Sequence, residues 1–486
     1  MCTQQPGPFD EAALGCEGLN PGAARFLFYL IVLEGSSLQE RLSLSSCIFV
    51  GSMLFGMFFG AGNLIFPVHM GQEAGSQLVP ATIGFLITGI GLPFLGIVAM
   101  GVSGSNGLFD LASRVHPSYA TFMTVLLYLT IGPAFALPRT ATVSYQIGLA
   151  PYISDAWQTP ALAGFTFLFF VVALLFSLRP SKILVWIGKL LNPLFLLFLA
   201  MLIFIAIMQP MGPVDTAAVQ GAYHEHAFFK GFTEGYNTMD VLASLAFGII
   251  VIRTLRDLGI RSAGGIVRGC LKAGFVSILL MGIIYSCLSY IGTTSLGSFT
   301  LSANGGIALA QIASYYFGSL GALLLALIVT LACLKTAIGL ITACSETFED
   351  LFPGFCSYRR YAFIFTGVSF LVGNVGLTQI ITLAVPILMF LYPLAITLVL
   401  LAFMTSLLHG RRGIYISTTI FTLLAAIGDA LQAMPAGAKE SGLVQGLLQC
   451  YVQLPFFDIG MGWIVPALAG FAIGCIWQAV RPAVQH

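Results

Sequence analysis

Long apolar stretches recur along most of this 486-residue chain, and they are the feature that most limits its fold. A helix that crosses a lipid bilayer needs about 20 mainly apolar residues. Apolar residues make up 58% of the sequence and charged residues only 8%, whereas a water-soluble domain carries about 25% charged residues. The sequence therefore predicts an integral membrane protein and excludes a water-soluble enzyme or a disordered chain. Its net charge of +1 also offers no basic surface for nucleic acid.

Twelve segments are apolar enough to be membrane spans. By residue number they cover about 46–69, 80–101, 119–147, 160–178, 183–208, 233–252, 270–292, 314–343, 361–376, 380–406, 412–430 and 460–480. These runs are long and lack the alternation of polar and apolar residues that is typical of membrane strands. We therefore predict an all-α polytopic membrane protein with 12 transmembrane helices.

The positions of the basic residues support this count. Sixteen of the 20 Lys and Arg residues fall on one side of the predicted topology, and only Lys230 and Lys439 fall on the other. Cytoplasmic loops collect Lys and Arg, so we expect both termini to be cytoplasmic. Residues 1–43 are expected to form a cytoplasmic leader, either disordered or at the membrane interface, and residues 44–480 the transmembrane domain.

The first span contains a pattern that disfavours a continuous helix. Gly60, Gly62 and Asn63 stand in its middle, and Pro67 follows. Glycine in a helix interior costs about 1 kcal/mol relative to alanine. The pattern predicts an unwound stretch with exposed backbone N–H and C=O groups. The alternative is a helix-packing face, because Gly56 and Gly60 form a small-x-x-x-small motif.

The sixth span opens with the polar run Gly-Tyr-Asn-Thr-Met-Asp at residues 235–240. Asp240 places a carboxylate near membrane depth, although it is also compatible with a helix-end charge favoured by the helix dipole. Interrupted helices at matching positions of two halves indicate the binding site of a transporter. Their spacing of five spans predicts two inverted five-helix repeats, about 46–208 and 233–406, followed by two extra helices, about 412–480.

Several of these runs resemble LeuT-type symporters of the amino acid–polyamine–organocation superfamily, and most specifically the bacterial branched-chain amino acid:cation symporter family. The matching segments are residues 58–67, 132–144 and 235–240, with a partial match at 330–340. The resemblance implies a LeuT-like fold and a secondary transporter, not an enzyme. It implies import of L-leucine, L-isoleucine and L-valine across the bacterial cytoplasmic (inner) membrane, coupled to a sodium or proton gradient.

Two other functions stay open at this point. A broadly apolar pocket would also suit another neutral amino acid such as methionine, and an ion channel would also place polar groups at mid-membrane. Beyond the coupling ion and the lipid bilayer, we expect no cofactor, no bound metal and no obligate protein partner. His224 and His226 lack a third partner at metal-binding spacing.

The resemblance also implies where a zwitterionic amino acid would bind. Backbone N–H groups of Ala61 and Gly62 would face its carboxylate, and carbonyls of the two broken helices would accept from its ammonium. Asn63 would offer an oxygen to a cation, or alternatively close the helix break. The substrate-binding candidates are Phe59, Gly60, Ala61, Gly62, Asn63, Thr238, Met239, Asp240 and Ser244.

A cation site is implied between the first and eighth spans. Its candidates are Gly56, Phe59, Asn63, Ala332, Lys335 and Thr336. Lys335 departs from the family pattern, in which sodium-coupled relatives carry a small residue. Lysine at membrane depth costs about 2.5–3.5 kcal/mol, so we expect its ammonium to take the place of sodium; the alternative is a side chain that reaches the cytoplasmic interface. Arg139 in the third span is expected either to anchor the external helix end or to contact substrate.

Overall fold

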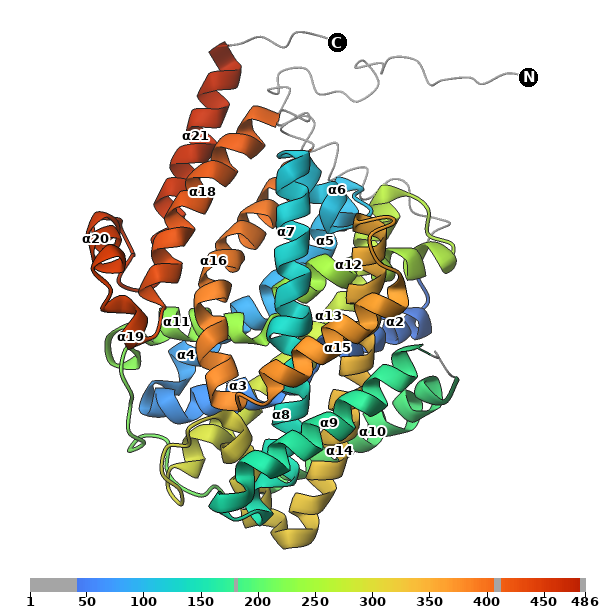
Figure 1. Ribbon diagram of the computed structural model, residues 1–486, viewed down its shortest axis with the longest axis vertical. Helices are drawn as coiled ribbons and strands as arrows, with labels where there is room; N and C mark the ends of the chain where they lie inside the picture. Colours follow the sequence, from blue (N-terminus) through green and yellow to red (C-terminus); the bar gives the residue numbers. More distant parts are fainter. Residues whose placement is uncertain (1–41, 179–181, 406–411, 481–486) are drawn as a thin grey trace.

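The computed structural model describes residues 42–178, 182–405 and 412–480, and all of its regular elements are helical in that part of the chain (Figure 1). The expected leader, residues 1–43, lies outside the described residues except for its last two positions. The all-α prediction is therefore confirmed for the described residues.

Each of the twelve predicted segments coincides with helical structure. In chain order these are α2 (Leu44–Phe58) with α3 (Ala61–Ala74); α4 (Leu78–Leu86), η3 (Ile87–Gly91) and α5 (Leu92–Ser103); α7 (Pro117–Leu129), η4 (Thr130–Ala134) and α8 (Ala136–Gly148); α9 (Gln158–Leu178); α10 (Lys182–Met208); α11 (Tyr223–Glu234), η7 (Gly235–Thr238) and α12 (Asp240–Asp257); α13 (Ala263–Ser295); α14 (Gly305–Leu351); α15 (Tyr358–Gly373); α16 (Leu377–Phe403); α18 (Arg412–Gln432); and α21 (Ile464–Val480).

The number of membrane spans is less firmly fixed than the helices themselves. Among the described residues, seven helical stretches are long and apolar enough to cross a membrane, and the bent pair α11–α12 makes an eighth. Others, such as α2 and α21, are apolar but shorter. The count of twelve spans therefore stays a prediction.

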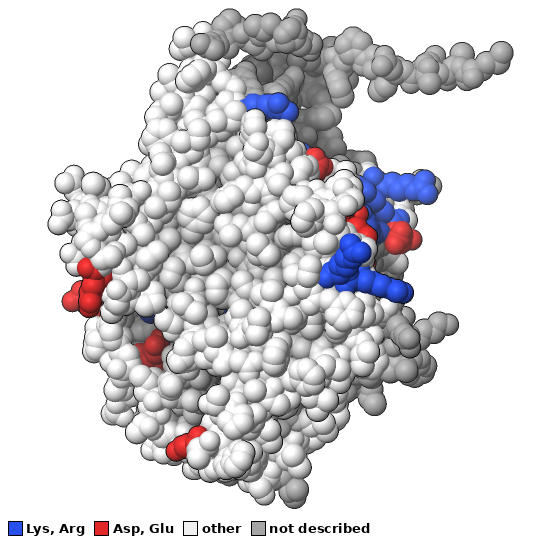
Figure 2. Space-filling model, in the orientation of Figure 1, with Lys and Arg blue, Asp and Glu red and all other residues white. Residues whose placement is uncertain are grey.

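Short helices connect the longer ones. They include α6 (Leu108–Ser113), α19 (Ala436–Lys439) and α20 (Gly442–Tyr451), and the last two lie beside α18 and α21 at one side of the molecule (Figure 1). Figure 2 shows a broad surface without charged side chains, while Lys and Arg side chains gather in one region of the face in view. Such a distribution suits a protein whose sides face lipid.

Glycines bring the second half of the first span against α13. A Cβ atom on Gly71 would lie 2.0 Å from the carbonyl oxygen of Ser289, and one on Gly292 would lie 2.0 Å from that of Val68. Only hydrogen fits at these positions, so the two helices touch backbone to backbone, as is common between membrane helices. Helices α4 and α11 approach each other in the same way. These contacts hold α3 and α11 in place around the site.

Candidate functional site

The first span breaks where the glycine pattern predicts. Helix α2 ends at Phe58, α3 begins at Ala61, and Gly60 is extended with φ −122° and ψ −168°. The Gly60 N–H donates a hydrogen bond to Oδ1 of Asn63 at 3.0 Å. Asn63 therefore closes the break, and the N–H groups at the start of α3 are left without partners in their own helix.

The sixth span breaks at Met239. This residue separates η7 from α12, its φ is +61°, and the two helical segments meet at a bend of 47°. The sequence alone could not decide between residues 236–240 and 244–248, and the structure selects the first region. A left-handed backbone costs a non-glycine residue about 1–2 kcal/mol. Strained positions of this kind cluster at ligand sites, where the surrounding structure holds them in place.

A cavity of about 430 Å³ lies between the two breaks. Ten of the predicted site residues line it: Gly56, Gly60, Ala61, Gly62, Asn63, Thr238, Met239, Asp240, Lys335 and Thr336. Phe59 and Ala332 instead line a separate hollow of about 30 Å³, which Gly56, Gly60 and Ala61 also border. The structure thus brings together residues that are more than 270 positions apart in the sequence.

Ser244 is the one predicted residue that lines neither space. It is fully buried, its hydroxyl donates to the Val241 carbonyl at 2.7 Å, and it lies against Gly96 of α5. Ser244 lies about one helical turn after Asp240, on the face of α12 that packs against α5. The structure therefore does not bring Ser244 to the site.

Asp240 is buried at the first turn of α12, with 2% of its surface exposed. Nδ2 of Asn63 donates to its Oδ2 at 2.6 Å, and the Tyr285 hydroxyl donates to the same oxygen at 3.4 Å. Asn63 Nδ2 also donates to the Tyr285 hydroxyl. Within the described part of the chain, the side chains hydrogen-bonded to this carboxylate are all neutral. Asp240 thus joins α3, α12 and α13 through a single carboxylate oxygen.

Arg139 lies in the wall of the cavity, with 6% of its surface exposed. Its Nη1 donates to the main-chain carbonyl of Asn237 at 2.7 Å, and its guanidinium carbon lies 5.0 Å from the centre of the Phe66 ring. A Cβ on Gly62 would come within 2.8 Å of Nη2. Arg139 therefore touches both breaks, which favours a role at the site over an anchor at the helix end.

The large cavity extends away from the breaks along two helices. On α14, Lys335, Gly339, Ala343 and Glu346 lie on the face that lines it, because residues three or four apart share one side of a helix. On α12 the lining continues to Ile250, just before the basic residues that end this helix. The cavity thus runs from the breaks toward the basic side of the molecule.

Tyr285 lines neither space but contacts both Asp240 and Asn63, and the sequence did not reveal this role. It is fully buried on α13, and its ring packs beside Phe59 and Phe85 with centroids 6.2 Å and 5.6 Å away. The only signal was a hydroxyl at membrane depth. Many of the chain's 16 tyrosines share that property, so the sequence could not single this one out.

Comparison with known proteins gives the family. The family described as "Branched-chain amino acid transport protein" matches residues 43–481. Branched-chain amino acid permease BrnQ of Lactobacillus delbrueckii is 46% identical over 90% of this chain and 97% of its own length. BrnQ of Bacillus subtilis is 42% identical, covering 91% and 99%, and the branched-chain amino acid transport system 2 carrier protein of Pseudomonas aeruginosa is 38% identical, covering 88% and 94%.

Solved structures support the predicted architecture. The inward-facing conformation of Mhp1 matches with a TM-score of 0.53 and 12% identity, over 89% of this chain and 91% of Mhp1. Mhp1 in a closed conformation with bromovinylhydantoin bound, described as a nucleobase-cation-symport-1 family transporter, matches with 0.54 and 14%, over 89% and 92%. At this identity the likeness shows the fold alone, and it confirms the LeuT-like arrangement. The family match covers nearly the whole described chain, and the chain therefore belongs to the branched-chain amino acid transport protein family.

Proposed function

We propose that this protein imports leucine, isoleucine and valine by symport with a cation, and that the cavity between the two helix breaks binds the substrate. One observation carries the proposal: two broken helices line a single cavity, which contains the start of α3, where the first N–H groups have no partners within their own helix, and the buried carboxylate of Asp240. A zwitterionic amino acid needs both.

The cavity walls fit an apolar side chain. Backbone N–H groups at Ala61 and Gly62 suit a carboxylate, since the start of a helix attracts anions. Ile131, Met239 and Phe247 supply apolar surface for the remainder of the molecule. One methylene group is worth only about 1–3 kcal/mol in such a pocket. We therefore expect the three branched-chain amino acids to compete with one another, with methionine as a weaker competitor.

Asp240 supplies the charge complement. The side chains hydrogen-bonded to this carboxylate are neutral, and the nearby Arg139 guanidinium, which acts on it electrostatically, is held by the Asn237 carbonyl. A buried carboxylate of this kind is stabilised further when a cation binds directly to it. The substrate ammonium or the coupling ion would meet this need. Asn63 and Tyr285 fix the carboxylate in position, so the cation would find its partner already oriented.

The coupling ion is the less constrained part of the proposal. Lys335 lines the large cavity and not the small hollow, next to Thr336, which lies opposite Gly60. Its ammonium would therefore substitute for the coupling cation from the large cavity. The small hollow bordered by Gly56, Phe59 and Ala332 is where sodium would otherwise be coordinated by carbonyl oxygens.

Orientation follows from charge. The large cavity runs toward the side that carries most Lys and Arg, which would be cytoplasmic. We therefore propose a protein of the bacterial inner membrane with both termini cytoplasmic, two inverted repeats and twelve spans. Its large cavity would extend toward the cytoplasm.

Uptake of radiolabelled leucine into proteoliposomes tests the function. Sodium and proton gradients are imposed separately, and isoleucine, valine and methionine are added as competitors. Saturable accumulation that is blocked by isoleucine and valine is the expected result. Equilibration without accumulation under either gradient would contradict symport and favour a channel.

A further inference from the structure

A second cavity, of about 240 Å³, also reaches the break in the sixth span. It shares no lining residue with the large cavity. Thr238 and Asp240 face the large cavity, whereas Glu234, Tyr236 and Asn237 face the second one. The short turn η7 therefore forms part of the partition between the two spaces.

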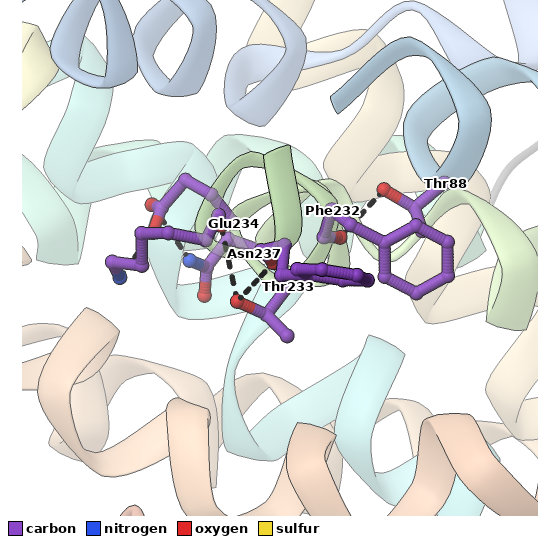
Figure 3. Close-up of polar contacts among 7 residues, drawn as sticks. Thr88, Phe232, Thr233, Glu234 and Asn237 are labelled. Carbon is purple, nitrogen blue, oxygen red and sulfur yellow. Dashed lines mark hydrogen bonds and ion pairs between the residues drawn. The ribbon is translucent and has the colours of Figure 1, made fainter. Parts of the chain in front are cut away.

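A series of polar contacts crosses this partition. Nζ of Lys230 lies 3.1 Å from Oε2 of Glu234, and the Asn237 side-chain amide donates to Oε1 of Glu234 at 2.9 Å. Figure 3 shows Asn237 turned toward Glu234. The main-chain carbonyl of the same Asn237 accepts the hydrogen bond of Arg139 at 2.7 Å. Glu234 in the second cavity is thus connected to Arg139 in the large one through a single residue.

The break in the helix makes this connection possible. Carbonyls at the end of a helical segment lack partners within it, and η7 ends just before Met239. The carbonyl of Asn237 is therefore available to a guanidinium, and a charged donor makes this hydrogen bond stronger than a neutral one. The η7 backbone sets the direction of that carbonyl, and the hydrogen bond from the Asn237 side chain to Glu234 is one of the contacts that hold this backbone.

Glu234 is far more buried than the other acidic residue of helix α11. It is 8% exposed and each carboxylate oxygen has its own partner, whereas Glu225 in the same helix is exposed. Burying a carboxylate costs free energy unless such partners are present. The Thr88 hydroxyl of η3 donates to the neighbouring Phe232 carbonyl at 2.7 Å (Figure 3). Glu234 is thus part of a fixed frame around η7.

We propose that Glu234 is a positioning residue for transport. By holding the Asn237 side chain, it sets the carbonyl that keeps the Arg139 guanidinium beside Gly62, where the substrate carboxylate would bind. Glu234 itself does not touch the substrate. The proposal rests on the function proposed above, because it assumes that the large cavity is the substrate site.

Three variants separate positioning from stability. Glu234→Leu removes the acceptor for Asn237, Glu234→Gln keeps an oxygen at that place, and Glu225→Leu is the matched control on the exposed side of α11. Initial rates of leucine uptake give KM and Vmax. Vmax is normalised to the amount of protein that elutes as a monodisperse peak. Glu234→Leu leaves the buried Asn237 side-chain amide without its acceptor, so we expect KM to rise about tenfold, which corresponds to about 1.4 kcal/mol. Glu234→Gln and Glu225→Leu should keep KM within about twofold of the wild type.

Asn237→Ala provides a second route that does not alter the buried charge. This variant keeps the main-chain carbonyl but frees it from Glu234, so its KM should rise as in Glu234→Leu. The double variant should be no worse than either single variant, because both act on the same contact. Unchanged KM in Glu234→Leu and Asn237→Ala, beside a normal wild type, would overturn the positioning role alone. Absence of saturable uptake in the wild type would instead overturn the proposed function.

Discussion

The two helix breaks that face the cavity are built in different ways. The first uses glycine: Gly60 is extended, the turn needs no left-handed residue, and Asn63 three positions later closes it. The second has Met239 in a left-handed conformation, and its neighbours are held by Arg139 on another helix. A break made by glycine is local and inexpensive, whereas a break at methionine persists because tertiary contacts enforce it.

In the function proposed above, each break would bind a different end of the amino acid. The first presents N–H groups that have no partner within their own helix and suit the carboxylate end of an amino acid, and the second presents Asp240, which suits its ammonium end. Substitutions at each break therefore test the comparison directly.

Gly62→Leu should have the largest effect and abolish leucine uptake. A Cβ at this position would already lie 2.8 Å from Arg139 Nη2, and the remaining atoms would fill the space beside the α3 N-terminus. Gly164→Leu is the matched control, because nothing lies within 4 Å of a Cβ at that position. Uptake is measured in proteoliposomes with equal amounts of folded protein. Normal uptake by folded Gly62→Leu protein would remove the first break from the site.

Asp240→Asn should reduce the rate of uptake by at least about tenfold, since a buried charge interaction is worth several kcal/mol. Asp110→Asn is the control: this exposed aspartate also occupies the first turn of a helix, where the helix-dipole contribution is about 0.3–1 kcal/mol. Similar, small losses in both variants would show that Asp240 is merely a helix-end charge and that the second break has no special task.

Lys335→Thr should change the ion dependence of uptake and not abolish it. If the ammonium of Lys335 replaces sodium beside the first break, wild-type uptake is insensitive to sodium, and the threonine variant gains a several-fold stimulation by it. Uptake rates are compared in sodium and choline buffers at constant membrane potential. Strong sodium stimulation of the wild type would contradict this role for Lys335.

Gly60→Ala should have the smallest effect, less than about twofold in uptake. The backbone at Gly60 is extended, which alanine adopts without strain, and the nearest atom to a new Cβ is 3.7 Å away. This variant sharpens the contrast with Gly62, only two residues further on. A severe loss in Gly60→Ala would mean that the first break must change conformation during transport.

Much of the candidate site could be predicted because short stretches of sequence indicate it. Gly60, Gly62 and Asn63 identify a break within a few residues, and the position of Asp240 at the start of an apolar run places a carboxylate near it. Ser244 could not be placed correctly, because its direction depends on how α12 turns after Met239. Glu234 and Tyr285 were missed, since they act through Asn237 and Asp240 rather than by lining the cavity, and such contacts cannot be seen in a sequence.

The sequence by itself determined the membrane class and the helical segments, indicated which two spans are broken and, through its resemblance to a known family, gave the expected substrates. These properties depend on apolar length, on glycine and on charge, each of which acts over one or two helical turns. Only the tertiary structure decided that Asn63 and Tyr285 meet at Asp240, that Arg139 touches both breaks, and that Lys335 shares their cavity. Such contacts join residues from 45 to about 275 positions apart, and helix packing alone brings them within reach.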